Sequence, residues 1–260
     1  MGGQNKSKIN QLLKVWPKGT VMTQAQLEKL GIYRQLVTKY LRYNWLERLG
    51  EGAYIRSGDK VGWEGGLYAL QSQMGMTIHV GGRTALELHG RSHYIPIGKQ
   101  KMVIMISDRQ ESLPVWFRRY SWGVNIEHGC FSLFDKVPDG ATGSLDCGGF
   151  EIVISSTERA IMEQMHRART NADFSHIHQL MEGLGTLRPD VLQNLLENCR
   201  SVKVKRLFLW NAEVVNHGWY DRLNISKVDL GKGKRLIYKG GYLNKKYQIT
   251  VPKTEELENV

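Results

Sequence analysis

The chain has 260 residues, which is enough to bury the hydrophobic core of one or two domains. Hydrophobic residues make up 41% of it and charged residues 23%, so the composition is that of a globular protein and excludes extended disorder. A net charge of +11 favours a polyanionic partner. No apolar run approaches the length of a membrane span, no export leader opens the chain, and the three cysteines lack paired spacing. We therefore expect a cytoplasmic protein with no membrane partner.

The charge is concentrated towards the two ends of the sequence. Residues 1–62 hold eleven basic and four acidic residues, a net charge of +7. Residues 63–200 have a net charge of −2, and residues 201–253 hold twelve basic and three acidic residues, a net charge of +9. This distribution predicts two separate basic surfaces rather than one uniformly basic shell.

The first sixty residues have the element order of a winged helix-turn-helix. Thr23 with Gln26 three residues later is a capping-box pattern, which marks the start of a helix. The predicted elements, in chain order, are helices over 6–16, 23–31 and 33–43 and a hairpin over 45–56 whose turn is Glu51-Gly52. We therefore predict a winged helix-turn-helix DNA-binding domain over residues 1–60, ending in a linker over 57–62.

From Trp63 onward the pattern is mixed. Helices are predicted over 63–75 and 83–90, and strands over 77–82, 101–107, 113–119, 122–128 and 148–155. Helices then fill most of the chain from Thr157 to about 219. The Gly-Ser at 143–144 has no carboxylate pair beside it and is interpreted as part of a turn. The fold class is therefore α+β: an N-terminal winged helix-turn-helix followed by a larger mixed domain over 63–260, with mixed strands to about residue 155 and helices afterwards.

The third predicted helix has two sharply different faces. On a helical wheel at roughly 100° per residue, Leu36, Val37, Tyr40 and Leu41 share one side, which we expect to pack in the core. The opposite arc contains no acidic residue; its members are Arg34, Gln35, Thr38, Lys39 and Arg42. An ordinary solvated face would normally mix both signs of charge, whereas Arg and Gln can pair bidentately with guanine and adenine edges. We predict that this face enters the major groove of DNA.

The predicted wing contributes further candidates for DNA contact. Arg48, Tyr54 and Arg56 lie on its two strands, where basic side chains can meet phosphates beside the groove.

Three segments carry a resemblance to a known family. The first is the pattern Gly31-Ile-x-Arg-Gln followed by Tyr40-Leu-Arg and by Trp45-Leu-Glu-Arg-Leu-Gly-x-Gly-x-Tyr. The second is residues 62–98, in which HVGGRTALELHG is the most distinctive run, and the third is LGKGKRLIYKGGYLNKKYQITVP at 230–252. Together they resemble the AbiE-type antitoxins, the AbiEi transcriptional regulators of type IV toxin–antitoxin systems. The resemblance covers nearly the whole chain, with residues 100–150 matched least well.

The resemblance implies a protein with two activities. The winged helix of this family represses its own operon, typically at inverted repeats of double-stranded DNA in the promoter. The C-terminal domain, here residues 63–260, neutralises a cognate nucleotidyltransferase-like toxin, in many cases without forming a stable complex. Such systems are associated with abortive infection and phage defence. The helix wheel supports the DNA-binding activity, whereas neutralisation follows from the resemblance alone.

A second basic cluster lies near the C-terminus, where lysines alternate with tyrosines in a predicted hairpin whose turn is Gly240-Gly241. Its members are Lys232, Lys234, Arg235, Lys239, Tyr242, Lys245 and Lys246. Alternating cations and aromatic rings can grip a nucleic-acid backbone and stack on bases. The same pattern also fits a plain hairpin with solvated lysines. The cluster could contact operator DNA, an RNA substrate of the toxin, or an acidic patch on the toxin itself.

The sequence supports a catalytic function less well than DNA binding. His89 and His93 have helical ligand spacing, but Gly90 between them ends the predicted helix, and His176 and His178 point to opposite sides of theirs. We therefore expect no catalytic residue, metal or cofactor. The alternative function is a one-component transcriptional regulator whose C-terminal domain binds a small effector, and the sequence does not separate it from the antitoxin.

Overall fold

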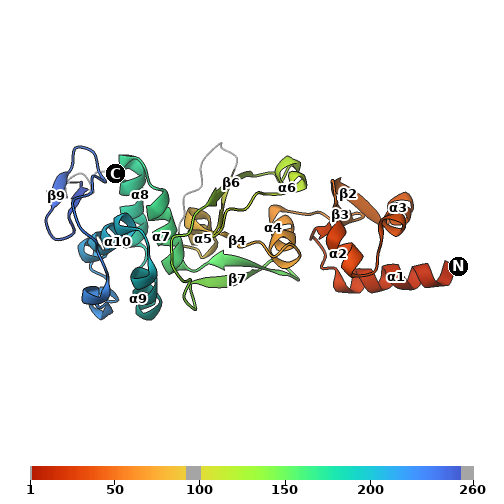
Figure 1. Ribbon diagram of the computed structural model, residues 1–260, viewed down its shortest axis with the longest axis horizontal. Helices are drawn as coiled ribbons and strands as arrows, with labels where there is room; N and C mark the ends of the chain where they lie inside the picture. The colour runs from red at the N-terminus through yellow and green to blue at the C-terminus, as the bar shows by residue number, and fades with distance from the viewer. Residues whose placement is uncertain (1, 92–100, 253–260) are drawn as a thin grey trace. The chain divides into compact units, whose positions relative to one another are not determined.

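The computed structural model describes residues 2–91 and 101–252 (Figure 1). Side chains are described from residue 8 onward. These residues form two compact units. The first contains 2–79, 101–130 and 144–153, and the second contains 80–91, 131–143 and 154–252. Helices and strands are interspersed throughout, so the predicted α+β class is confirmed.

The winged helix forms the start of the first unit. Its elements are α1 (Gly2–Val15), β1 (Met22–Thr23), α2 (Gln24–Lys29), α3 (Arg34–Arg42), β2 (Leu46–Gly50) and β3 (Ala53–Arg56). The strands form an antiparallel sheet in the order β1-β3-β2. Each predicted helix and both predicted strands are present, and the two-residue strand β1 was not predicted. Its core is made by Ile9, Leu12, Trp16, Met22, Leu27, Ile32, Val37, Tyr40, Leu46 and Tyr54.

Local sequence explains the turns between these elements. The Thr23 hydroxyl accepts a hydrogen bond from the Gln26 backbone N–H at 3.2 Å and so caps α2. Gly31, with φ of +74°, makes the turn into α3, and Gly52, with φ of +71°, makes the turn of the wing. Both turns need a left-handed backbone conformation that is favourable mainly for glycine, and the sequence has glycine at both positions.

The remaining elements of the first unit are α4 (Trp63–Ser72), β5 (Met102–Ser107), α6 (Val115–Arg119) and β6 (Asn125–Cys130). A five-stranded sheet has the order β6-β5-β4-β8-β7, with β4 at Ile78–Val80, β7 at Thr142–Asp146 and β8 at Glu151–Ser155. β5 and β6 are parallel, with Met102 opposite Asn125. Parallel pairing suits the apolar run of β5, whose residues 103–107 are all buried.

Two predictions in this region are wrong. Residues 113–119 were expected to form a strand because Leu113, Val115 and Phe117 alternate, but the segment is the helix α6. Pro114 starts it, and the consecutive residues Trp116 and Phe117 are both buried, which an alternating strand does not allow. Residues 142–146, interpreted as a turn, form β7 at the edge of the sheet. Most of its residues are exposed, so no hydrophobic alternation marks it.

The second unit is mainly helical. Its helices are α5 (Gly82–Leu88), α7 (Thr157–Arg167), α8 (Asn171–Glu182), α9 (Pro189–Asn198) and α10 (Val202–Val215), with 3-10 turns at Tyr220–Arg222 and Ile225–Lys227. Thr170 and Asp173 form a capping box at the start of α8, and Asn216, in the left-handed conformation, ends α10. The helices expected after residue 157 are therefore confirmed.

The junction HVGGRTALELHG is held by a buried ion pair on α7. The Gly82 N–H donates to Glu163 Oε2 at 3.0 Å, and Glu163 Oε1 accepts from Arg159 Nε at 2.7 Å. The Ser155 hydroxyl donates to the same carboxylate at 2.8 Å. Because both charges are about 1–2% exposed, their mutual hydrogen bonds are what make burial tolerable. Contacts with α7 therefore fix the tight junction between β4 and α5.

The C-terminal hairpin differs from the prediction in its turn. It consists of β9 (Tyr242–Asn244) and β10 (Ile249–Val251), so the chain reverses between residues 245 and 248. Gly241 lies at the start of β9 instead. A side chain there would come within 2.2 Å of the Val251 carbonyl oxygen, so close strand packing explains this glycine.

Candidate nucleic-acid interface

The two faces predicted for α3 are both present. Val37 and Tyr40 are buried, while Leu36 and Leu41 are partly buried against the winged-helix core. All five polar residues of the opposite face are exposed, namely Arg34, Gln35, Thr38, Lys39 and Arg42. The helix therefore presents three cations and an amide to solvent without an acidic residue of its own.

The surroundings of α3 modify the role of two of these side chains. The Thr38 hydroxyl donates to the Arg34 carbonyl oxygen at 3.0 Å, so only its lone pairs are available to a ligand. The Arg34 side chain is 84% exposed, and its Nε lies 3.7 Å from Glu28 Oε1 on α2. An acidic group thus lies beside the recognition face, which the sequence of α3 alone did not indicate.

The two arginines predicted on the wing differ in their surroundings. Arg48 is exposed, and its guanidinium lies 5.7 Å from the centre of the Tyr54 ring. Arg56 is half-buried, and its Nη1 donates to the Trp16 carbonyl oxygen at 2.9 Å. That bond closes the end of α1, so we assign Arg56 to the fold of the winged helix.

Tyr54 was also predicted to lie at the DNA-facing surface, and this is wrong. The residue is 5% exposed, and its hydroxyl donates to Gln24 Oε1 at 3.0 Å. Tyr54 is part of the winged-helix core, and residues 53–55 are buried in succession, so other elements cover both faces of β3. Tyr54 acts as a support under Arg48 and beside α2.

Exposed aromatic residues flank α3 and were missed in the sequence. Tyr33 directly precedes the helix and is 63% exposed, and Tyr43 directly follows it and is 61% exposed. Trp45 is 44% exposed. Large exposed rings are unusual on a soluble surface and are suited to contact sugars or base edges. Their positions just outside the helical periodicity explain why the wheel did not single them out.

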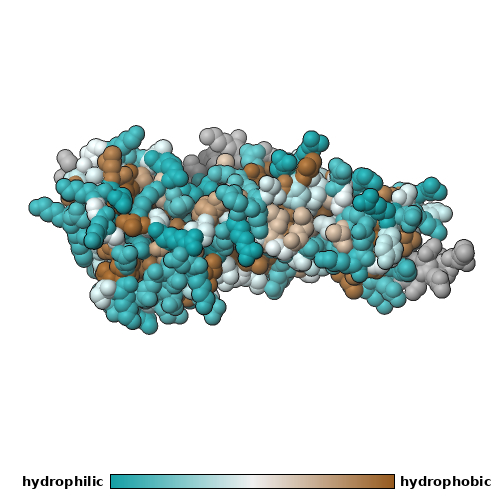
Figure 2. Space-filling model, in the orientation of Figure 1, coloured by the Kyte–Doolittle hydropathy of each residue, from teal (hydrophilic) through white to brown (hydrophobic). Residues whose placement is uncertain are grey.

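The second basic cluster is exposed as predicted, and a buried arginine organises it. All seven of its residues have exposed side chains, and Figure 2 shows mainly hydrophilic residues over the segment around β9. Arg206, 2% exposed, donates to the carbonyl oxygens of Leu230, Gly231 and Gly233 at 2.6–3.1 Å. Because these carbonyls turn inward, the loop is held in one shape. Lys246 is engaged separately, with Nζ 2.7 Å from Glu213 Oε1.

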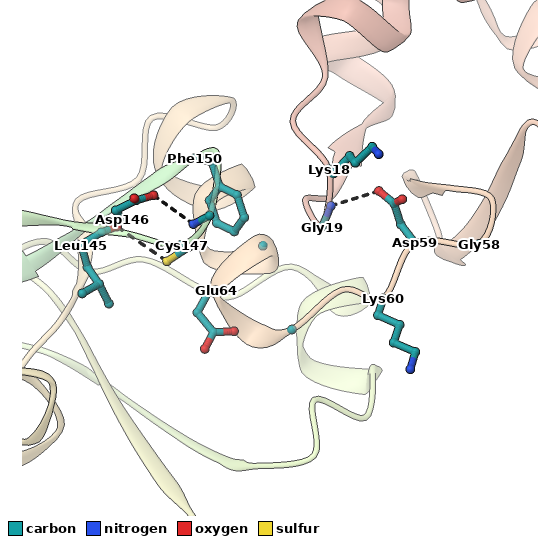
Figure 3. A pocket seen from close by; sticks show the side chains of 13 residues that line it. Lys18, Gly19, Gly58, Asp59, Lys60, Glu64, Leu145, Asp146, Cys147 and Phe150 are labelled. Atoms are coloured by element: carbon teal, nitrogen blue, oxygen red, sulfur yellow. Dashed lines mark hydrogen bonds between the residues drawn. The ribbon is translucent and has the colours of Figure 1, made fainter.

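A polar pocket of about 600 Å³ lies beside the linker (Figure 3). Two of its carboxylates are used by the fold: Asp59 Oδ2 accepts from the Gly19 N–H at 3.0 Å, and Asp146 Oδ1 accepts from the Gly148 N–H at 2.9 Å. Burial raises the pKa of the Cys147 thiol to about 11, with Glu64 and Asp146 adding to the shift. The thiol is therefore protonated at neutral pH and is a poor nucleophile.

The histidines occupy structural positions. His89 Nε2 lies 2.9 Å from the Ser155 carbonyl oxygen, and His178 Nδ1 lies 3.0 Å from Asn211 Oδ1. His93 falls outside the described residues. Among residues 2–91 and 101–252, no three His, Cys, Asp or Glu side chains are grouped so as to hold a metal ion.

Two family models together match nearly the whole chain. Residues 100–252 match the transcriptional regulator, AbiEi antitoxin, of type IV toxin–antitoxin systems, and residues 5–97 match the AbiEi antitoxin N-terminal domain. The chain belongs to the AbiEi antitoxin family. The resemblance seen in the sequence is therefore confirmed.

The AbiEi fold of this chain has a counterpart among solved structures. The crystal structure of the RV2827C protein from Mycobacterium tuberculosis superposes with a TM-score of 0.59 and 13% sequence identity, covering 98% of this chain and 94% of that one. At this identity the likeness establishes the fold alone. No curated protein sequence matches the chain.

Membership of the AbiEi family establishes an antitoxin that is a transcriptional regulator, a class distinct from enzymes. Such a regulator has DNA and a toxin as its general partners. Within the part of the chain that the structure describes, no helix is both long and apolar enough to cross a membrane.

Proposed function

We propose that this AbiEi-family regulator represses transcription of its own operon by placing α3 in the major groove of its promoter. One observation carries the proposal: the acid-free side of α3 is wholly exposed, while its other side forms the core of the winged helix. Arg34, Gln35 and Lys39 then lie where base edges and phosphates would meet them. Arg48 of the wing meets a phosphate beside the groove.

We further propose that residues 63–260 neutralise a nucleotidyltransferase-like toxin, without a stable complex, in the cytoplasm. Support comes from family membership and from the exposed basic cluster around the loop that Arg206 holds. A division of the chain into residues 1–60 for DNA and 63–260 for the toxin is part of this proposal.

The first experiment is fluorescence anisotropy of the purified chain with its own upstream promoter and with a scrambled duplex of equal length, at two salt concentrations. Tight promoter binding that survives the higher salt supports sequence-specific repression. Equal and salt-sensitive binding to both duplexes would mean that the basic chain attracts DNA only non-specifically, because non-specific electrostatic binding weakens steeply with salt. The proposal for α3 would then be rejected.

Neutralisation is tested in the full-length chain, because residues 63–79 share a compact unit with the winged helix. Cells expressing the toxin receive either the unmodified chain or the double variant Arg34→Ala/Lys39→Ala from an independent promoter. Full rescue by the double variant would mean that toxin neutralisation does not depend on the proposed DNA-contacting side chains. Loss of rescue by a folded double variant contradicts the proposed division.

The small-effector regulator remains the second candidate, and the pocket beside the linker favours it. This pocket is large enough for a metabolite and is lined by linker residues 58–60 and by Phe150. Promoter affinity is measured with and without a low-molecular-weight cell extract, for the unmodified chain and for Cys147→Phe, which fills the pocket. If the extract changes the promoter affinity of the unmodified chain but not that of Cys147→Phe, the result supports binding of a small effector in the pocket. A toxin gene adjoining that of the regulator supports the antitoxin.

A further inference from the structure

A chain of side-chain interactions connects the wing to the recognition helix. Tyr54 Oη on β3 donates to Gln24 Oε1 at 3.0 Å, and Gln24 Nε2 donates to Glu28 Oε1 at 2.9 Å. The same oxygen of Glu28 lies 3.7 Å from Arg34 Nε. We call Tyr54, Gln24 and Glu28 the support chain; it begins at the buried ring of Tyr54 and ends at the Glu28 carboxylate beside the exposed Arg34.

The arrangement gives Glu28 a defined direction. Gln24 is itself fixed, because its backbone N–H donates to the Gly52 carbonyl oxygen at 2.8 Å and its side-chain oxygen is held by Tyr54. Gln24 therefore holds the Glu28 carboxylate on the side that faces Arg34. The ring of Tyr54 also lies under the guanidinium of Arg48. One buried side chain thus supports both exposed arginines near the proposed DNA surface.

Arg34 has more to gain from such support than a shorter side chain would. A long, 84% exposed side chain samples many rotamers, and bidentate pairing with a base requires only one of them. An exposed ion pair contributes little to folding stability. Restricting the rotamers of a base-reading arginine before it binds, in contrast, acts directly on discrimination between base pairs.

We propose that Glu28, held by Gln24 and Tyr54, is a positioning residue that sets the base specificity of Arg34. This inference rests on the proposed function, in which α3 reads operator DNA. Glu28 also places a negative charge near the phosphates, so it weakens binding to any duplex. Its two effects on DNA therefore differ in sign: it lowers affinity for all sequences and raises the preference for the operator.

The difference in sign distinguishes positioning from a role in folding alone. The variant Glu28→Gln keeps the shape of the side chain and removes its charge. The matched control is Glu51→Gln in the wing turn, an exposed residue outside the support chain. Both variants lose one negative charge from the winged helix, so both should bind a scrambled duplex more tightly. Only Glu28→Gln should also lose preference for the operator.

The experiment measures anisotropy with the promoter, a scrambled duplex and a panel of single base-pair substitutions, using the full-length chain. Glu28→Gln is made alone and in an Arg34→Ala background. We expect the single variant to lose about two- to fivefold of its discrimination at one base pair, in line with the strength of an exposed ion pair. In the Arg34→Ala background the same change should have no effect at that base pair. Tyr54→Phe, which keeps the ring under Arg48, should shift discrimination in the same direction by less.

Several results would overturn the inference. An unchanged base-pair profile in Glu28→Gln, or the same loss in Glu51→Gln, removes any special role for Glu28. A loss that persists in the Arg34→Ala background means that Glu28 contacts DNA itself instead of acting through Arg34. If the unmodified chain shows no preference for its promoter, the proposed function fails and this inference fails with it. A promoter preference that is independent of Glu28 rejects the inference alone.

Discussion

Gly50 of the wing lies directly against Trp116 of α6. A Cβ atom on Gly50 would come within 2.7 Å of the Trp116 Cβ and 3.1 Å of its Cα. A Cβ on Gly65 of α4 would likewise come within 1.9 Å of the Gly19 carbonyl oxygen. Two glycines therefore allow the winged helix to pack against α4 and α6. The winged helix is therefore part of a larger compact unit and not a freely tethered module.

This packing predicts the effect of Gly50→Ala. The Trp116 backbone cannot move aside as the end of a flexible side chain could, so the added methyl group should destabilise the chain by about 1–3 kcal/mol. Urea unfolding followed by tryptophan fluorescence measures the change. Gly218→Ala is the control, because no heavy atom comes within 4 Å of a Cβ there. Equal stability of the two variants would show that the contact with α6 does not form.

Arg34 and Lys39 should respond differently to removal if they have different roles. Arg34→Ala is expected to cost about 1–3 kcal/mol of operator binding and to relax specificity at one position. Lys39→Ala should weaken all sequences alike and reduce the slope of log K against log salt by about one unit. Binding isotherms over a salt series, with operator and scrambled duplexes, measure both quantities. A uniform loss from both variants would remove Arg34 from base readout.

Tyr40 offers a test of the winged-helix core. It is 4% exposed, and among the described residues its buried hydroxyl has no hydrogen-bond partner. Because an unsatisfied buried polar group costs about 1–3 kcal/mol, Tyr40→Phe should be as stable as the unmodified chain or more stable. The unfolding midpoint in urea checks this, and Tyr54→Phe is the matched control because its hydroxyl is bonded. A clear loss of stability in Tyr40→Phe would mean that its hydroxyl has a partner.

The sequence predicted most elements because their signals are local. The polar caps of α2 and α8 and the glycine turns at 31 and 52 all act within a few residues. The predictions were wrong where tertiary contacts determine the secondary structure. α6 contains alternating apolar residues, yet burial of both Trp116 and Phe117 favours a helix. β1 has only two residues and exists because β3 pairs with it.

The candidate site was predicted in part for the same reason. Periodicity alone separates the exposed and buried sides of α3, so all of its polar residues were found. Tyr54 and Arg56 were assigned by their position on the wing, but packing in the winged-helix core buries Tyr54. Glu28 belongs to another helix, and only the packing of α2 beside α3 brings it to Arg34. The exposed and buried faces of one helix could be predicted from its own sequence, whereas a contact between two helices could not.

The last prediction concerns acid stability and Glu158 at the start of α7. Burial alone would raise the pKa of this carboxyl, but hydrogen bonds from the Arg188 side chain and backbone outweigh it and hold the pKa below its ordinary value of 4.5. A carboxyl with a lowered folded-state pKa stabilises the fold above pH 4.5, and this contribution is lost as the pH falls through the folded-state value.

Glu158→Gln should therefore destabilise the chain at pH 7 by about 1.5–3 kcal/mol, the usual contribution of hydrogen bonds to a charged group. The difference from the unmodified chain should begin to narrow as the pH falls below 4.5 and should vanish below the lowered folded-state pKa, where the Glu158 carboxyl of the unmodified chain is also neutral. Unfolding midpoints from about pH 2 to about pH 7, a range that includes the unfolded-state pKa and extends well below it, measure this dependence. Asp139→Asn, an exposed acid of the same unit, is the control. A difference that stays constant across the series would show that Glu158 contributes through packing and not through its charge.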